Sequence, residues 1–238
     1  DAVAGLIGET SDIHFTGKYD LAAHLVSFDK AEATLATGSL TTGGTIDLAG
    51  KTLDLSGTLS TALDPLPGST RGRVSGPFKV TGALTRPAIE LTLTGSNFAG
   101  LPDPVLSATG PSPALRASLE VKDGGLKIAS ARLSGQRAVM TAAGLWSWSG
   151  SSDVRASLIQ SQTIPVVDWS VTLGSGQLQL TGRPNSRHYT LTTTGGRATG
   201  AGRLVDNLAL TATLQDTGRA ITGPVTLRAS VDGEAFAT

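Results

Sequence analysis

The chain has 238 residues, with 19 basic and 19 acidic side chains, no formal net charge and a charged fraction of only 16%. A neutral chain without runs of like charge lacks the electrostatic footprint of a nucleic-acid binder, so no nucleic acid is expected as a partner. The absence of cysteine excludes disulfides and thiolate metal sites, and 30 glycines with few charged residues favour strands and tight turns over helices.

Apolar and polar residues alternate from one end of the chain to the other. In residues 53–60, Leu53, Leu55 and Leu59 share one side, and the residues between them are polar or glycine. Such period-two alternation is typical of a half-buried β-strand. The same alternation predicts further strands, five to eight residues long, at 78–84, 89–93, 115–121, 169–173, 177–181, 208–214 and 225–231.

Short glycine-rich sequences between these segments predict hairpin turns and therefore an antiparallel meander. Pro87 is expected to separate two strands, and residues 164–168 to hold a short turn. Residues 97–113 are rich in Pro, Gly and Ser and predict a long loop, which places the one expected sub-boundary near 100–113. We interpret residues 1–238 as a single β-rich segment of a longer protein.

No motif in the sequence carries catalytic chemistry. Residues 44–52 resemble a phosphate-binding loop, but five residues separate the glycines where the motif needs four, and another strand follows where the motif needs a helix. His14, His24 and His188 have no metal-ligand spacing. The chain is therefore predicted not to be an enzyme and to need no metal or cofactor.

A sheet with one apolar face must cover that face with a second sheet, with itself or with an apolar partner. Aromatic residues make up only 4% of the chain, so the apolar face is mainly aliphatic, which suits an acyl chain. At about 0.8 kcal/mol per buried CH₂, a chain of ~14 carbons gains roughly 11 kcal/mol before ordering costs. The predicted lipid-groove residues are Leu53, Leu55, Leu59, Phe78, Val80, Leu84, Ile89, Leu91, Leu93, Leu119 and Leu210.

Residues 74–91 resemble the repeated cadence G-x-(L/F)-x-(V/L)-x-G-x-L-x-x-P-x-(I/L) of the TamB/AsmA-like family, and shorter matches occur at 57–59 and 181–184. The resemblance implies an elongated, curled, taco-like sheet, rich in antiparallel pairs, with a hydrophobic inner groove. It also implies a periplasmic location in a Gram-negative envelope, within a full-length protein whose inner-membrane anchor lies outside this chain.

The function that the resemblance implies is to bind or conduct phospholipid between the inner and outer membranes and to support outer-membrane assembly. The implied partners are phospholipid acyl chains and, through the full-length protein, an Omp85-type outer-membrane barrel. The family offers no catalytic residue to carry over.

Two other interpretations stay open at this point. The first is an adhesin-like or autotransporter-like β-solenoid, a structural stalk whose own coils bury its apolar face. A constant repeat length would favour it, and the sequence shows none. The second is a carbohydrate-active or hydrolytic enzyme whose site is assembled from dispersed carboxylates.

Overall fold

A computed structural model describes residues 12–35, 37–63, 71–100, 103–160, 162–218 and 220–237. Strands make up 75% of the structure and helix 3%, which confirms the predicted all-β class. The chain divides into two compact units: unit 1 comprises Asp1–Leu101 and Pro111–Val121, and unit 2 comprises Pro102–Gly110 and Lys122–Thr238. The chain thus changes unit within the 100–113 stretch and again after Val121.

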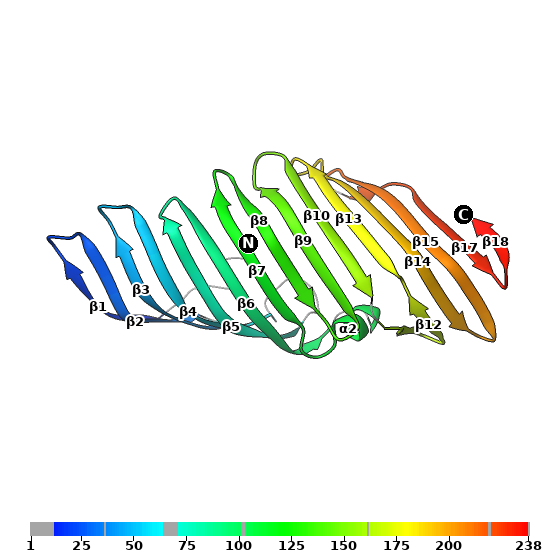
Figure 1. Cartoon of the computed structure of the whole chain (residues 1–238), viewed down its shortest axis with the longest axis horizontal. Coiled ribbons are helices and arrows are strands. Elements are labelled where there is room, and N and C mark those ends of the chain that lie inside the picture. Colours follow the sequence, from blue (N-terminus) through cyan, green and yellow to red (C-terminus); the bar gives the residue numbers. More distant parts are fainter. Residues whose placement is uncertain are drawn as a thin grey trace. The chain divides into compact units, whose positions relative to one another are not determined.

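Unit 1 is an antiparallel meander. Its strands are β1 (Asp12–Asp20), β2 (Leu25–Leu35), β3 (Gly38–Asp47), β4 (Thr52–Ala62), β5 (Arg71–Ala83), β6 (Arg86–Ala99) and β7 (Ala114–Lys122). Each strand pairs with the next along the chain, and the strands lie side by side in that order (Figure 1). Tight connections enforce this arrangement from β1 to β4 and between β5 and β6, because a short turn can join only antiparallel neighbours.

Unit 2 begins with a short helix and continues as antiparallel strands, which belong to the same 18-stranded sheet as those of unit 1. Its elements are α2 (Asp103–Thr109), β8 (Gly125–Ser134), β9 (Ala138–Ser147), β10 (Ser152–Gln160), β11 (Ile164–Val166), β12 (Trp169–Thr172), β13 (Ser175–Gly182), β14 (His188–Gly200), β15 (Arg203–Asp216), β16 (Ile221–Thr222), β17 (Val225–Val231) and β18 (Glu234–Ala237). Among the described residues, no helix is long and apolar enough to cross a membrane.

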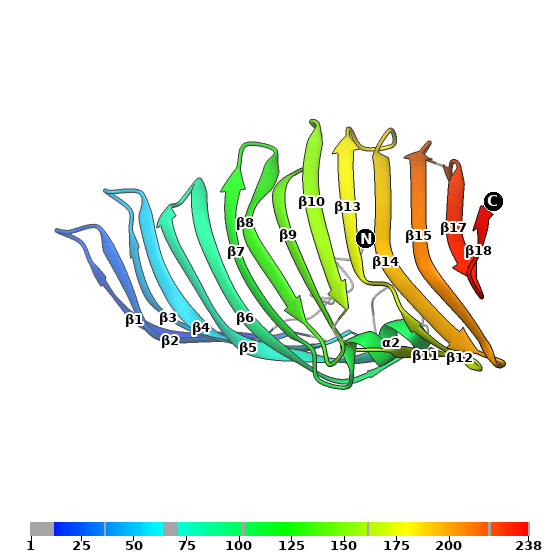
Figure 2. The same ribbon diagram turned by 45° about the vertical axis from the view of Figure 1, so that its right-hand side comes forward.

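One long strand of unit 2, β14, has two partners on the same side. Its first part, from His188 to Thr194, pairs with β13, and its last part, from Arg197 to Gly200, pairs with β12. The short hairpin of β11 and β12 therefore lies beyond the end of β13 (Figure 2). This hairpin contains the turn expected in residues 164–168.

Most strands are longer than the predicted five to eight residues, reaching 14 in β6 and β15, whereas β11, β12, β16 and β18 are shorter. Pro87 does not separate two strands, because it lies within β6, opposite Gly82. The backbone N–H and C=O of Arg86 point toward β5, so the backbone groups of Pro87, the next residue, point toward β7. Pairing of β6 with β7 starts only at Ala88. The missing N–H of Pro87 therefore costs no ladder hydrogen bond.

The prediction of a long loop at residues 97–113 is also wrong in part. Strand β6 continues to Ala99, and α2 forms within the remainder. The helix ends at Gly110, whose φ of 69° is left-handed and whose N–H donates to the Leu106 carbonyl at 2.8 Å. This is an ordinary glycine-terminated helix end.

Glycines at strand centres allow neighbouring strands to approach closely. Gly76 of β5 has a φ of 154°, and a Cβ there would overlap the backbone oxygen of Thr92. Gly144 of β9 has a φ of 135°, and a Cβ there would overlap the backbone oxygen of Asp153 and lie 2.8 Å from the Val154 Cα. Each unit therefore contains a strand position that only glycine fits.

Candidate hydrophobic binding site

The strand register of unit 1 brings predicted groove residues into one row. Cross-strand pairs join Leu55 to Val80, Val80 to Ile89, and Ile89 to Leu119. Directly opposed side chains have Cβ atoms ~5 Å apart, so these four residues, here called the aliphatic row, form one continuous apolar strip. Phe78 and Leu91 form a second pair beside this strip.

The face that carries this row, here called the inner face of unit 1, is not sealed by a packed second layer of described residues. Its apolar side chains along β4 and β5 are half-buried, alternating with exposed neighbours. Among the described residues, the buried hydrophobic side chains are Leu93, Ile164, Leu180, Ala198, Ala212 and Ala229. A closely packed core would bury large side chains along every strand, so the described residues cover the inner face only in part.

The opposite face of the same strands is polar. Asp54, Lys79 and Glu90 alternate with the inner-face residues, and the Lys79 Nζ lies 3.8 Å from the Asp54 Oδ1. Both side chains of this ion pair are more than half exposed, so the pair contributes little to stability. The two faces thus differ in chemistry as the alternation predicts.

The structure places all but two of the predicted groove residues on the inner face of unit 1. Leu84 lies in the turn between β5 and β6 and is 38% exposed. Leu210 belongs to β15 of unit 2, opposite Thr193 and Leu227. The inner-face residues are Leu53, Leu55, Leu59, Phe78, Val80, Ile89, Leu91, Leu93 and Leu119.

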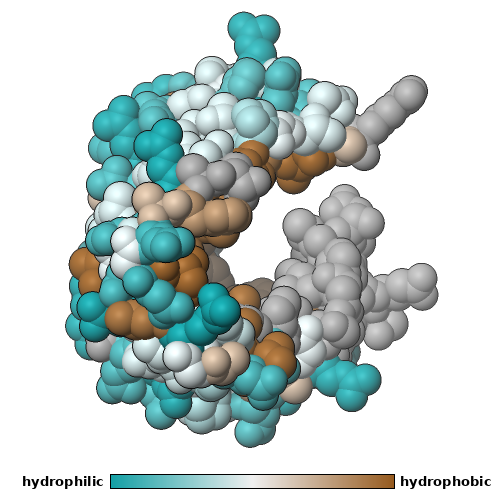
Figure 3. All heavy atoms as spheres, turned by 90° about the vertical axis from the view of Figure 1, so that its right-hand side faces the viewer, coloured by the Kyte–Doolittle hydropathy of each residue, from teal (hydrophilic) through white to brown (hydrophobic). Residues whose placement is uncertain are grey.

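Unit 2 contains an apolar cavity of about 240 Å³ beside helix α2, here called the α2 pocket. Val105 and Ala108 line it from the helix. Strands β8 to β11 contribute Leu133, Met140, Leu158 and Ile164. Figure 3, which faces the β18 end of unit 2, shows hydrophobic side chains gathered on the hollowed side of the sheet and hydrophilic ones over most of its rounded side.

Two polar side chains, Thr109 and Gln160, line the α2 pocket, and their hydrogen bonds are made within the protein. The Thr109 Oγ1 donates to the Val105 carbonyl at 2.8 Å. Gln160 is 7% exposed. Its Nε2 donates to the carbonyls of Gln162 at 2.7 Å and Val171 at 2.8 Å, and its Oε1 accepts from the Leu173 N–H at 2.8 Å. The amide therefore satisfies nearby backbone groups, and the pocket presents mainly C–H surface to a ligand.

Helix α2 is held against the sheet by the turn between β8 and β9. The backbone N–H groups of Gln136 and Arg137 donate to the carbonyls of Thr109 and Ala108, each at 3.0 Å. The Arg137 Nη1 also donates to the Ser107 Oγ at 3.2 Å and to the Thr163 carbonyl at 2.9 Å. Arg137 thus joins α2 to the segment that leads into β11.

We expect the substitution Arg137→Met to loosen α2 without unfolding unit 2. Hydrogen bonds from a charged donor contribute about 1.5 kcal/mol each, so amide exchange in residues 103–110 should rise roughly tenfold or more. Hydrogen-exchange mass spectrometry measures this, with strand β14 as an internal reference. Unchanged exchange in residues 103–110 would show that the backbone bonds alone hold the helix.

Sequence reasoning missed the α2 pocket because it assigned residues 97–113 to a loop. The available signal was the apolar spacing of Val105, Leu106 and Ala108 before Gly110, which fits one helix face ended by a glycine. The Pro, Gly and Ser content around it outweighed this short pattern.

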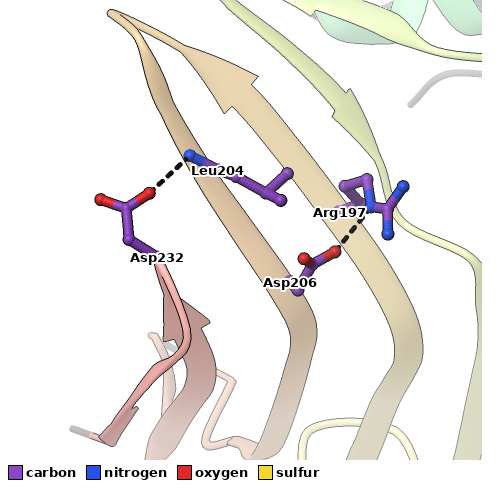
Figure 4. A network of polar contacts seen from close by, with 4 residues as sticks. All are labelled: Arg197, Leu204, Asp206 and Asp232. Carbon is purple, nitrogen blue, oxygen red and sulfur yellow. Dashed lines mark hydrogen bonds and ion pairs between the residues drawn. The ribbon is translucent and has the colours of Figure 1, made fainter.

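Carboxylates of unit 2 take part in structural contacts. The Arg197 Nε of β14 donates to the Asp206 Oδ1 of β15 at 2.6 Å, and the Leu204 N–H donates to the Asp232 Oδ1 at 3.1 Å (Figure 4). The first contact joins β14 to β15, and the second joins β15 to the turn between β17 and β18. Within the described ranges, no three His, Asp or Glu side chains are grouped closely enough to hold a metal ion.

Comparison with protein-family models, curated proteins and solved structures finds no match to this chain. The resemblance of residues 74–91 to the TamB/AsmA-like family therefore stays a prediction from the sequence.

Proposed function

We propose that this chain is a non-catalytic lipid-binding scaffold whose inner face in unit 1 holds phospholipid acyl chains. The observation that carries the proposal is the aliphatic row, which crosses four strands and is half-buried. A continuous apolar strip of this kind is energetically unfavourable in water unless an apolar partner covers it.

Acyl chains match this face in chemistry and in energy. The row is aliphatic and has no charged side chain, so it offers dispersion contacts but no site for a headgroup. At about 0.8 kcal/mol per CH₂, covering eight methylene groups gives roughly 6 kcal/mol before ordering costs. Binding through the hydrocarbon alone is therefore feasible, and it does not depend on headgroup identity.

The cellular setting is proposed from the sequence resemblance. In this proposal the chain belongs to a periplasmic region of a protein anchored in the inner membrane. It binds or conducts phospholipid between the two membranes and supports outer-membrane assembly, and the full-length protein meets an Omp85-type barrel. The antiparallel pairing of both units favours this setting over a β-solenoid stalk, whose coils would pair in parallel.

Site-specific photocrosslinking tests the proposal in the full-length protein. A benzophenone amino acid replaces Leu55 or Leu91 on the inner face, and Asp54 or Glu90 as the adjacent outer-face control. We expect mass spectrometry to find phospholipid adducts from the two inner positions and few from the two outer ones. Equal yields from both faces, or no lipid adduct from the inner face, would contradict the proposal.

A further inference from the structure

We infer that the α2 pocket binds the methyl-terminal end of an acyl chain, an assignment that rests on the lipid-binding function proposed above. The pocket is a second apolar surface, confined to unit 2, and it differs from the inner face of unit 1 in being bounded by both a helix and a sheet.

The size of the pocket suits a segment of hydrocarbon. An apolar protein cavity of ~150 Å³ accommodates benzene, so the 240 Å³ of the α2 pocket corresponds to roughly ten carbon atoms. Such a volume is too small for a whole phospholipid and matches part of one chain. The ligand therefore enters with one end only.

The lining determines which end enters. Gln160 uses its amide for Gln162, Val171 and Leu173. The Thr109 hydroxyl donates to the Val105 carbonyl, and the rest of the pocket surface is apolar. An ester or phosphate placed there would therefore lose its hydrogen bonds to water without replacement. A methyl terminus has no such bonds to lose.

The contact between α2 and the β8–β9 turn closes one end of the pocket. A Cβ at Gly135 would lie 2.6 Å from the Ala108 carbonyl oxygen and 2.7 Å from the Thr109 Cα, so the two backbones touch there. The hydrogen bonds of Gln136 and Arg137 to α2 hold this contact. A closed end accommodates a chain terminus, whereas the middle of a chain needs two exits.

Apolar area in the pocket is left uncovered by the protein itself. Val105 is 43% exposed and Met140 is 41% exposed, although both line the pocket. A hydrocarbon tail would cover these side chains from the remaining side, and burial of this area would favour binding.

The first test uses phospholipids that carry a diazirine at a chosen carbon of one acyl chain, added to the full-length protein. We expect the probe with the diazirine next to the terminal methyl to label peptides containing Val105, Met140 or Leu158. The probe with the diazirine next to the ester should not label them. Labelling by both probes, or by neither, would overturn the assignment.

The second test uses n-decane and variants that fill the pocket. Ala138 lines the pocket, whereas Ala143 lies on the exposed opposite face of the same strand. We expect saturating decane to raise the Tm of the wild type and of Ala143→Phe by about 3 °C or more, and that of Ala138→Phe by clearly less. Ala108→Phe is a second filling variant, should Ala138→Phe fail to fold.

The outcomes separate this assignment from the proposed function. Lipid adducts on the inner face of unit 1 without terminal-diazirine labelling of the pocket would overturn the pocket assignment alone. Stabilisation by decane without any lipid adduct on either surface would overturn both, because the pocket would then be a hydrocarbon cavity unrelated to lipid. Equal stabilisation of the wild type and both filling variants would likewise overturn the assignment.

Discussion

Replacing Gly144 by alanine should lower the free energy of unfolding of unit 2 by about 3 kcal/mol or more. The added Cβ would overlap the backbone oxygen of Asp153, an atom of the β9–β10 ladder. Relief requires β9 and β10 to separate near one end of their ladder, and the φ of 135° is itself unfavourable for an L-residue. Both effects destabilise the same pair of strands.

Chemical denaturation followed by circular dichroism measures this change, and Gly202→Ala is the matched control. Gly202 also has a positive φ, 72°, but no atom lies within 4 Å of a Cβ built there. We expect the control to lose only about 1 kcal/mol, the cost of the left-handed conformation. Equal losses in the two variants would show that close strand approach is not the cause.

Replacing Leu91 by aspartate should abolish most lipid binding while leaving unit 1 folded. Leu91 lies opposite Phe78 and Ala117 on the inner face. Loss of contact with about three methylene groups costs about 2.4 kcal/mol. This corresponds to a roughly fifty-fold weaker affinity. Because Leu91 is only half-buried, the carboxylate can remain hydrated in the lipid-free protein.

Titration with a fluorescent phospholipid measures the affinity, and Thr92→Asp supplies the control on the next residue of the same strand. Thr92 is exposed on the outer face, opposite Arg116, so its replacement should leave affinity and circular dichroism unchanged. A similar loss of affinity in both variants would mean that the added negative charge weakens binding whichever face of the sheet carries it.

The sequence predicted the all-β class and most inner-face residues because the period of side-chain alternation in a strand does not depend on register. Leu53 and Leu55 face the same side of their strand whichever strands are neighbours, provided that the segment is a strand. Burial of one apolar face then favours the registers that place Val80 on that side as well. The row that Leu55 and Val80 form with Ile89 and Leu119 depends on register, which is set by turn geometry. It could therefore not be predicted from alternation alone.

Two features escaped prediction for physical reasons. Helix α2 has 7 residues, too few to be stable alone, so it depends on contacts with the turn at 135–137 that are distant in sequence. In β8, the register shifts between Ile128 and Ala131, so a strict alternation loses its phase within the strand. Leu84 was misplaced for a related reason, since alternation does not show where a strand ends and its turn begins.

The divided pairing of β14 has a consequence for access to unit 2. Ile164, which lines the α2 pocket, belongs to the β11–β12 hairpin, and β12 pairs with the last residues of β14, beyond the irregularity at Gly196. Besides that ladder, the Gln160 amide fastens the same hairpin at Val171. The Arg137 guanidinium holds Thr163, directly before the hairpin. Detaching the hairpin would break these contacts but spare the β13 ladder, so the pocket wall can open without separating the long strands of unit 2.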